Sequence, residues 1–245
     1  MTHRHIRRAS LITLAVALAL IAGAAPVRAQ MEGHGGLGSL HFMMVFPQGD
    51  FKKNVDDLGF GFSGDLAYAV PQLPVVAGLQ LGYAIYGSKT FTVPFSETIG
   101  IVNADVTTTN SLGLFHLFLR LQPNHGVFRP YIEGLVGGAY LVTSSSITNK
   151  NTGEEVAGST NRDDFAFSYG AGGGIAFLVH EEKDAGDPFQ VFVDLRVRYL
   201  YGGEATYFRS DAVQMRDGKL FFDNSKVHTS KTDLFTPHLG VTIRF

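Results

Sequence analysis

The stretch "FQVFVDLRVRYLY", residues 189–201, decides the fold, because its apolar and polar positions alternate along the chain. The even positions are mostly polar and include Gln190, Asp194, Arg196 and Arg198. The odd positions form an unbroken apolar series: Phe189, Val191, Val193, Leu195, Val197, Tyr199 and Tyr201. A period of two places successive side chains on opposite faces of a β-strand. The stretch therefore predicts a strand with one apolar face and one mostly polar face.

The same alternation recurs along the chain and predicts eight strands in all. They are expected at 38–47, 58–70, 75–87, 107–121, 128–142, 164–179, 189–201 and 232–245. Each has about 10–15 residues, which is enough for a tilted strand to cross a lipid bilayer. An even number of such strands is typical of an antiparallel up-and-down membrane barrel.

The connections between these strands alternate in length. Short connections are expected at 71–74, 122–127 and 180–188. Longer ones are expected at 48–57, 88–106, 143–163 and 202–231. Short turns at one end and long loops at the other are the organisation of an outer-membrane barrel. The long loops at 144–161 and 206–226 are polar, and we expect them to continue as sheet, with a turn at Asp217–Gly218.

Two classes of fold compete for this pattern: a soluble β-sandwich or lipocalin-like barrel, and a membrane barrel. Eight stripes of Phe, Tyr, Leu and Ile would overfill the interior of an eight-stranded barrel, so the apolar faces are expected to point outward. The opposite faces carry small residues and charges, among them Asp65, Arg120, Glu133, Asp194, Arg196, Arg198 and Arg244. The prediction is an all-β protein, an eight-stranded antiparallel up-and-down transmembrane β-barrel. Its lumen charges are interpreted as a paired plug, the alternative being an ion path or a polar-ligand site.

The first 29 residues are expected to be a cleaved Sec-type signal peptide. A basic start precedes an apolar run, and cleavage is predicted between Ala29 and Gln30. Residues 30–245 are then a single barrel domain with 16 Lys and Arg against 22 acidic residues, a net charge of −6. A mildly acidic exported chain gives no electrostatic reason to bind nucleic acid. With no Cys in the sequence, a closed sheet must supply the stability without disulfides.

The segment "HLGVTIRF" ends the sequence with His238, Gly240, Ile243 and Phe245 at fixed spacing. It resembles the C-terminal assembly signal of small eight-stranded outer-membrane proteins such as the OmpA membrane domain and OmpX. The resemblance implies insertion by the barrel-assembly machinery and a monomer among outer-membrane lipids and lipopolysaccharide. It also implies periplasmic termini and extracellular long loops. Because the sequence has no Trp, any aromatic belt is expected from Tyr68, Tyr83, Tyr86, Tyr131, Tyr140, Tyr199 and Tyr201.

Candidate chemistry is sparse. The histidines show no spacing typical of a metal site, so neither a metal nor another cofactor is expected. His228 and Ser230 resemble the pair used by lipid A deacylases, but Asp233 is the only acid that follows them. The sequence therefore favours a non-enzymatic structural or cell-surface role. Its alternatives are a lipid A-modifying enzyme and an OmpW-type carrier of small apolar molecules.

Overall fold

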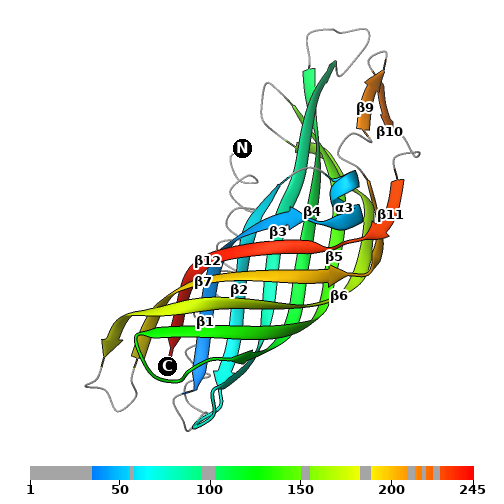
Figure 1. Cartoon of the computed structure of the whole chain (residues 1–245). Coiled ribbons are helices and arrows are strands. Elements are labelled where there is room, and N and C mark those ends of the chain that lie inside the picture. Colours follow the sequence, from blue (N-terminus) through cyan, green and yellow to red (C-terminus); the bar gives the residue numbers. More distant parts are fainter. Residues whose placement is uncertain are drawn as a thin grey trace.

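The computed structural model describes residues 35–55, 58–94, 103–149, 155–182, 189–208, 213–216, 219–222 and 227–245. Eight antiparallel strands close into a barrel in the order β1-β12-β7-β6-β5-β4-β3-β2 (Figure 1). Their bounds are β1 Gly36–Pro47, β2 Gly59–Ala69, β3 Val75–Pro94, β4 Asn103–Leu121, β5 Phe128–Asn149, β6 Glu155–Glu182, β7 Phe189–Gly202 and β12 Leu234–Arg244. Every barrel strand pairs with its sequence neighbours in the barrel, and β12 pairs with β1. The predicted fold class is confirmed.

Four strands are longer than the alternation of apolar residues indicates. β3, β4, β5 and β6 continue past the rest of the wall at the end of the long connections (Figure 1). Their predicted bounds, 75–87, 107–121, 128–142 and 164–179, therefore stop short. The added residues are rich in Ser and Thr, which carry no apolar alternation, and Thr has a good β-propensity for a pleated surface.

Smaller elements fill the long connections. The short helix α3 (Gly49–Asn54) follows β1, and β8 (Glu204–Phe208) pairs with β11 (Val227–Lys231). β9 (Val213–Arg216) pairs with β10 (Lys219–Phe222). These two strands flank the predicted Asp217–Gly218 turn, which lies outside the described residues, as do the predicted signal peptide and its cleavage site. No helix in the described part of the chain has the length and apolar character needed to cross a membrane.

Apolar side chains cover the outer wall of the barrel. Leu117 and Ile132 are each 64% exposed, and large apolar residues of all eight barrel strands share this orientation. Tyr83, Tyr140, Tyr169 and Tyr201 are also exposed. The expectation that Tyr86 and Tyr131 belong to an outer belt is wrong, because both are buried inside the barrel. Their parity on β3 and β5 points them inward.

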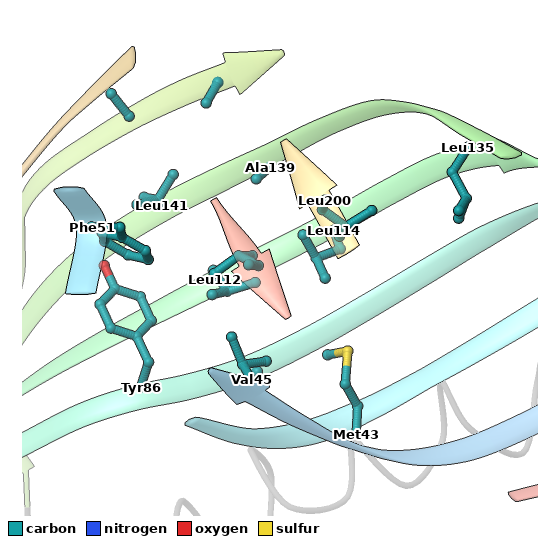
Figure 2. Packing of buried hydrophobic residues seen from close by; sticks show 14 of the residues in the cluster. Met43, Val45, Phe51, Tyr86, Leu112, Leu114, Leu135, Ala139, Leu141 and Leu200 are labelled. Atoms are coloured by element: carbon teal, nitrogen blue, oxygen red, sulfur yellow. The ribbon is translucent and has the colours of Figure 1, made fainter. Parts of the chain in front are cut away.

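The lumen has two layers. Toward the long connections it is apolar, with Met43, Val45, Leu112, Leu114 and Leu141 in one buried cluster (Figure 2). A lumen that is polar along its whole length, as the sequence suggested, is therefore only half correct. Continuous apolar runs such as "FMMVF" (42–46) are the signal for this layer, since both faces of the strand are then apolar.

Helix α3 covers the open end of the apolar layer. The ring of Phe51 contacts the ring of Tyr86, with a centroid distance of 5.6 Å (Figure 2). It also contacts the ring of Tyr207, with a centroid distance of 4.9 Å. Asn54 donates a hydrogen bond to the Tyr207 hydroxyl over 3.1 Å. The backbone N–H of Gln48, just before the helix, donates to the carbonyl of Asp233 over 2.9 Å. The helix is thus fixed to the barrel rim by both packing and hydrogen bonds.

Candidate functional site in the barrel lumen

A cluster of buried charges fills the lumen toward the short turns. We call it the ion-pair cluster: Asp65, Glu133, Asp194, Arg120, Arg196 and Arg198. All six side chains are 4% exposed or less. They come from β2, β4, β5 and β7. On each of these strands they occupy the alternate positions whose side chains point into the barrel. Three carboxylates offset three guanidinium groups, so the cluster is neutral, as a buried group of charges must nearly be.

Glu133 accepts hydrogen bonds from two arginines. Arg120 on the neighbouring strand β4 donates its Nε to Oε2 over 3.0 Å. Arg198 on β7 donates its Nε to Oε1 over 2.6 Å, across the intervening strand β6. Within the described residues, Nη1 and Nη2 of Arg198 have no hydrogen-bond partner. Its bond to Glu133 is therefore the contact that holds this guanidinium in place.

Asp65 and Arg196 form the second pair. Both Nη nitrogens of Arg196 donate to the two carboxylate oxygens of Asp65, the Nη2–Oδ1 distance being 3.2 Å. Nη2 also lies 3.3 Å from the Ser63 hydroxyl, which in turn is 3.1 Å from Nδ1 of His238. Because the Arg–carboxylate contact is two-pronged, it fixes orientation as well as charge.

Asp194 is held by a tyrosine, a histidine and a threonine. The Tyr131 hydroxyl donates to Oδ1 over 2.6 Å, and His41 Nε2 lies 3.3 Å from Oδ2. Nδ1 of His41 is 4.0 Å from Asp65, so the imidazole stands between two carboxylates. The hydroxyl of Thr242 donates to Oδ2 over 3.4 Å. These contacts link Asp194 to the Asp65–Arg196 pair, and Tyr131 also contacts the Arg120 guanidinium, which joins Asp194 to the Glu133 pair.

Glycines on β6 make room for this network. A Cβ on Gly172 would stand 2.8 Å from Cγ of Arg198, and one on Gly174 would stand 2.5 Å from the Tyr131 hydroxyl. The guanidinium of Arg120 lies over the Tyr131 ring, 3.9 Å from its centroid. A larger residue at position 172 or 174 would displace the arginine or the tyrosine, which explains the glycines at these two positions.

The predicted members of the charge network do not all meet. Six of the seven form the ion-pair cluster, whereas Arg244 near the short turns donates its Nη1 to the carbonyl of Asn124 over 3.4 Å. Arg120, Asp194 and Arg244 also line a small pocket at this end, with room for about one water molecule. A role of the network as a plug stays a prediction.

The geometry of His228 and Ser230 does not form a catalytic arrangement. The Ser230 hydroxyl is 2.8 Å from the Tyr207 hydroxyl and donates to the carbonyl of Lys231 over 3.0 Å. Asp233 accepts the backbone N–H of Gly202 over 3.0 Å. Within the described residues no hydrogen bond or ion pair joins His228 to Ser230 or to a carboxylate. No contact therefore favours the lipid A-modifying alternative. An apolar carrier would need a lateral opening in the wall. The described residues provide no such opening between strands, because all neighbouring barrel strands pair.

Sequence reasoning placed Arg196, Arg198 and Asp194 on one inward face but missed Tyr131. That residue was assigned to the outer belt because tyrosines are common at membrane interfaces. The parity of β5 could have found it, since Tyr131 and Glu133 are two residues apart and share one face.

Comparison with known proteins gives likenesses to solved structures and to no sequence family. No family model and no curated protein sequence matches it. Among solved structures it is similar to Neisserial surface protein A (10% identity, 85% of this chain and 94% of that one, TM-score 0.35). It is also similar to Ail, the attachment invasion locus protein of Yersinia pestis (14%, 88% and 100%, TM-score 0.36). A third is the N-terminal β-barrel domain of Pseudomonas aeruginosa OprF (14%, 86% and 99%, TM-score 0.31). At these values the likenesses add nothing to the fold that the strand pairing already defines.

Proposed function

We propose that this chain is an integral outer-membrane β-barrel protein with a closed lumen and a structural or cell-surface interaction role. The observation that carries the proposal is the inverted burial of its side chains. Phe62, Leu117 and Ile132 are 62–64% exposed on the outer wall, while Arg198 and Asp194 are at most 1% exposed inside. Water would disfavour such a wall over its whole circumference, whereas lipid hydrocarbon favours it.

Closure of the sheet supports the same environment. Lipid offers no hydrogen-bond partner to backbone N–H and C=O groups, so a spanning sheet must have no free edge. Here Gly36 and Phe245 exchange two backbone hydrogen bonds of 3.0 and 2.9 Å, at the seam between β1 and the end of β12. The wall is therefore complete where β1 and β12 meet.

The lumen of the proposed protein is closed at two levels. The ion-pair cluster crosses the half near the short turns, where Leu37, Ala69 and Val76 are also buried, and apolar residues with Phe51 fill the half near the long connections. We place the termini in the periplasm and the long loops outside the cell. The partners are outer-membrane lipids and lipopolysaccharide, with the barrel-assembly machinery during insertion, and the barrel acts as a monomer.

Cell fractionation and labelling test the proposal. The native protein should enter the outer membrane and migrate differently on gels before and after boiling, as closed barrels do. Because the chain has no Cys, a single introduced Cys reports the accessibility of one end of the barrel. Thr229→Cys reports the end with the long connections, and His125→Cys reports the end with the short turns. On intact cells the first should react with an impermeant maleimide and the second should not. A soluble periplasmic protein, or labelling at His125→Cys alone, contradicts the proposal. Unchanged lipid A mass spectra on deletion would argue against the enzymatic alternative.

A further inference from the structure

The four long strands form a separate sheet beyond the barrel wall. β2 pairs with β3 only as far as Ile85, and β7 pairs with β6 only from Ser168 onward. Past these points β3, β4, β5 and β6 pair with one another alone, and they project from the barrel in Figure 1. The outer face of this sheet continues the outer face of the barrel, because each strand keeps its alternation apart from three register shifts, at Ile85/Gly87, Thr143/Ser144 and Ile147/Thr148.

Hydroxyl side chains occupy this outer face in register. One row runs through Ser88, Thr109, Ser144 and Thr160, and the next through Thr90, Thr107 and Ser146 to Gly158. A third row runs through Thr92, Asp105 and Thr148 to Glu155. We call these positions the hydroxyl face. Strands lie about 4.8 Å apart and alternate residues about 6.8 Å apart, so the face is a regular array of hydroxyl groups.

These hydroxyls can still bind a ligand. The Oγ1 atoms of Thr90 and Thr107 are 2.9 Å apart, and Thr92 donates to Asp105 over 2.7 Å, both in exposed positions. A hydroxyl has one donor and two acceptor sites, so one internal bond leaves further capacity on each oxygen. The other Ser and Thr residues of the array are exposed or half-buried.

The hydroxyl face begins where the apolar band ends. Tyr83, Tyr140 and Phe165 share one row across β3–β6 and are 42–56% exposed. Aromatic residues of this kind mark the lipid headgroup level. Ser144 lies four residues beyond Tyr140, about 13 Å along the strand. The array therefore stands at and beyond the headgroups of the outer leaflet, beside the bilayer rather than above the lumen.

The charge of the face selects among possible headgroups. No Lys or Arg occupies these three rows, and Asp105 and Glu155 make them acidic. Lys89 and Arg162 are paired with Thr108 and Thr143 and therefore lie on the opposite side of the sheet. Phosphate is normally bound by Arg or Lys, so the face does not suit it. Neutral sugars present hydroxyls that both donate and accept, which matches the array.

We propose that the hydroxyl face docks the neutral sugar residues of outer-leaflet glycolipids. The inference rests on the proposed function, because it requires the apolar band to lie in the bilayer. The barrel and the projecting sheet then contact the same glycolipid: the wall contacts the acyl chains of the lipid, and the hydroxyl face contacts its sugars.

Three lipids that share a ceramide tail supply the probes: one with a neutral trisaccharide headgroup, bare ceramide, and ceramide 1-phosphate. The full mature chain is reconstituted in phosphatidylcholine nanodiscs with each, and native mass spectrometry counts the retained lipid. We expect the trisaccharide lipid to be enriched roughly fivefold over both others, which corresponds to about one net hydrogen bond. Thr107→Val, Thr109→Val, Ser144→Ala and Ser146→Ala together should remove the preference.

The matched control is Thr206→Val with Thr229→Val, which removes an exposed cross-strand hydroxyl pair of 3.0 Å on β8 and β11 and should keep the preference. If the fourfold variant loses its heat-modifiable band, the β4 pair and the β5 pair of substitutions are tested separately. Equal retention of the three lipids, preference for the phosphate lipid, or an unchanged preference in the folded variants overturns the inference alone. Failure of the native chain to enter bilayers overturns the proposed function with it.

Discussion

Glu133 on β5 and Arg198 on β7 are joined by a 2.6 Å hydrogen bond although β6 separates their strands in the wall. The contact passes over Gly172 on β6, which pairs with Glu133 on one side and with Arg198 on the other. An Arg side chain can lie flat over β6 only because this position has no Cβ. The hydrogen bond between these two charged side chains therefore depends on the glycine at position 172.

Gly172→Ala should therefore destabilise the barrel. The new Cβ would stand 2.7 Å from the carbonyl oxygen of Val197 and 2.8 Å from Cγ of Arg198. Neither is the free end of a flexible side chain, so the strand or the arginine must shift, at a cost of about 1–3 kcal/mol. The free energy of unfolding in urea, measured in lipid vesicles, checks this. Gly134→Ala is the control, since a Cβ there meets nothing within 4 Å, and equal losses in both variants would contradict the explanation.

Arg196→Ala should cost more. It leaves the buried carboxylate of Asp65 without its two-pronged partner, a loss of roughly 3–5 kcal/mol in the fully buried limit. Hydration of the lumen would reduce this figure. The double variant Asp65→Asn/Arg196→Gln removes both charges and should lose less stability than the single change. Lys53→Ala, which breaks an exposed pair with Asp50, should be close to neutral. A single variant as stable as the native protein would show that the pair contributes nothing.

Planar bilayer recordings test the closed lumen. The native protein should show little steady conductance, because ion pairs and apolar side chains occupy the two halves of its lumen. Phe51→Ala opens only the apolar half, so it should stay nearly as silent. Large, stable, ion-selective currents from the native protein would instead make the charges of the ion-pair cluster the lining of a pore.

Phe51→Ala should act on α3 and leave the barrel intact. The substitution removes both ring contacts, to Tyr86 and to Tyr207, and deletion of a buried Phe costs about 3–5 kcal/mol. Since α3 is a short helix in a connection, we expect this loss to free the helix locally. Faster proteolysis between 48 and 57, with an unchanged heat-modifiable core, is the expected result. Uniform loss of the folded band would show that α3 supports the whole barrel.

The strands of the barrel could be predicted because lipid and lumen impose opposite chemistry on alternate residues. β7 shows this most clearly, and its predicted range of 189–201 differs from the observed one by a single residue. The ends of β3–β6 extend beyond the predicted bounds because polar residues dominate there. The apolar row of Phe91, Val106 and Ile147 contributes only one position to each of three strands, which is too few to reveal a period of two. Helix α3 has only six residues, too few for a helical period to appear.

The candidate site was predictable in membership but not in pairing. Parity alone turns Asp65, Glu133 and Arg198 inward. Which carboxylate meets which guanidinium depends on the stagger of the closed barrel, and a sequence does not state that stagger. The Glu133–Arg198 bond crosses a whole strand, and the apolar layer arises where Met43 and Val45 replace the polar residues that parity leads one to expect.

Phe245 lies at the seam between β1 and the end of β12. Replacing it tests whether the predicted assembly signal contributes more to insertion than an apolar ring on the outer wall does. Phe245 exchanges backbone hydrogen bonds with Gly36, and its ring covers Gly36 so closely that a Cβ there would be 2.6 Å away. Phe245→Ser should lower the fraction inserted in the outer membrane several-fold, because it removes the aromatic end of the signal and uncovers the seam.

Phe128→Ser is the matched control. Phe128 is also an aromatic residue of the outer wall beside the short turns, 52% exposed, and it stands outside the predicted signal. Its loss removes similar apolar area, about 1.5–3 kcal/mol for a fully buried side chain and less here. Quantitative blots of outer-membrane fractions, with unboiled and boiled samples side by side, give the inserted and folded amounts. Insertion of Phe128→Ser near the native level, with Phe245→Ser retained in the periplasm, supports the signal. If the two variants insert equally well, the terminal ring is ordinary lipid-facing surface, and residues 238–245 carry no assembly information beyond their strand pairing.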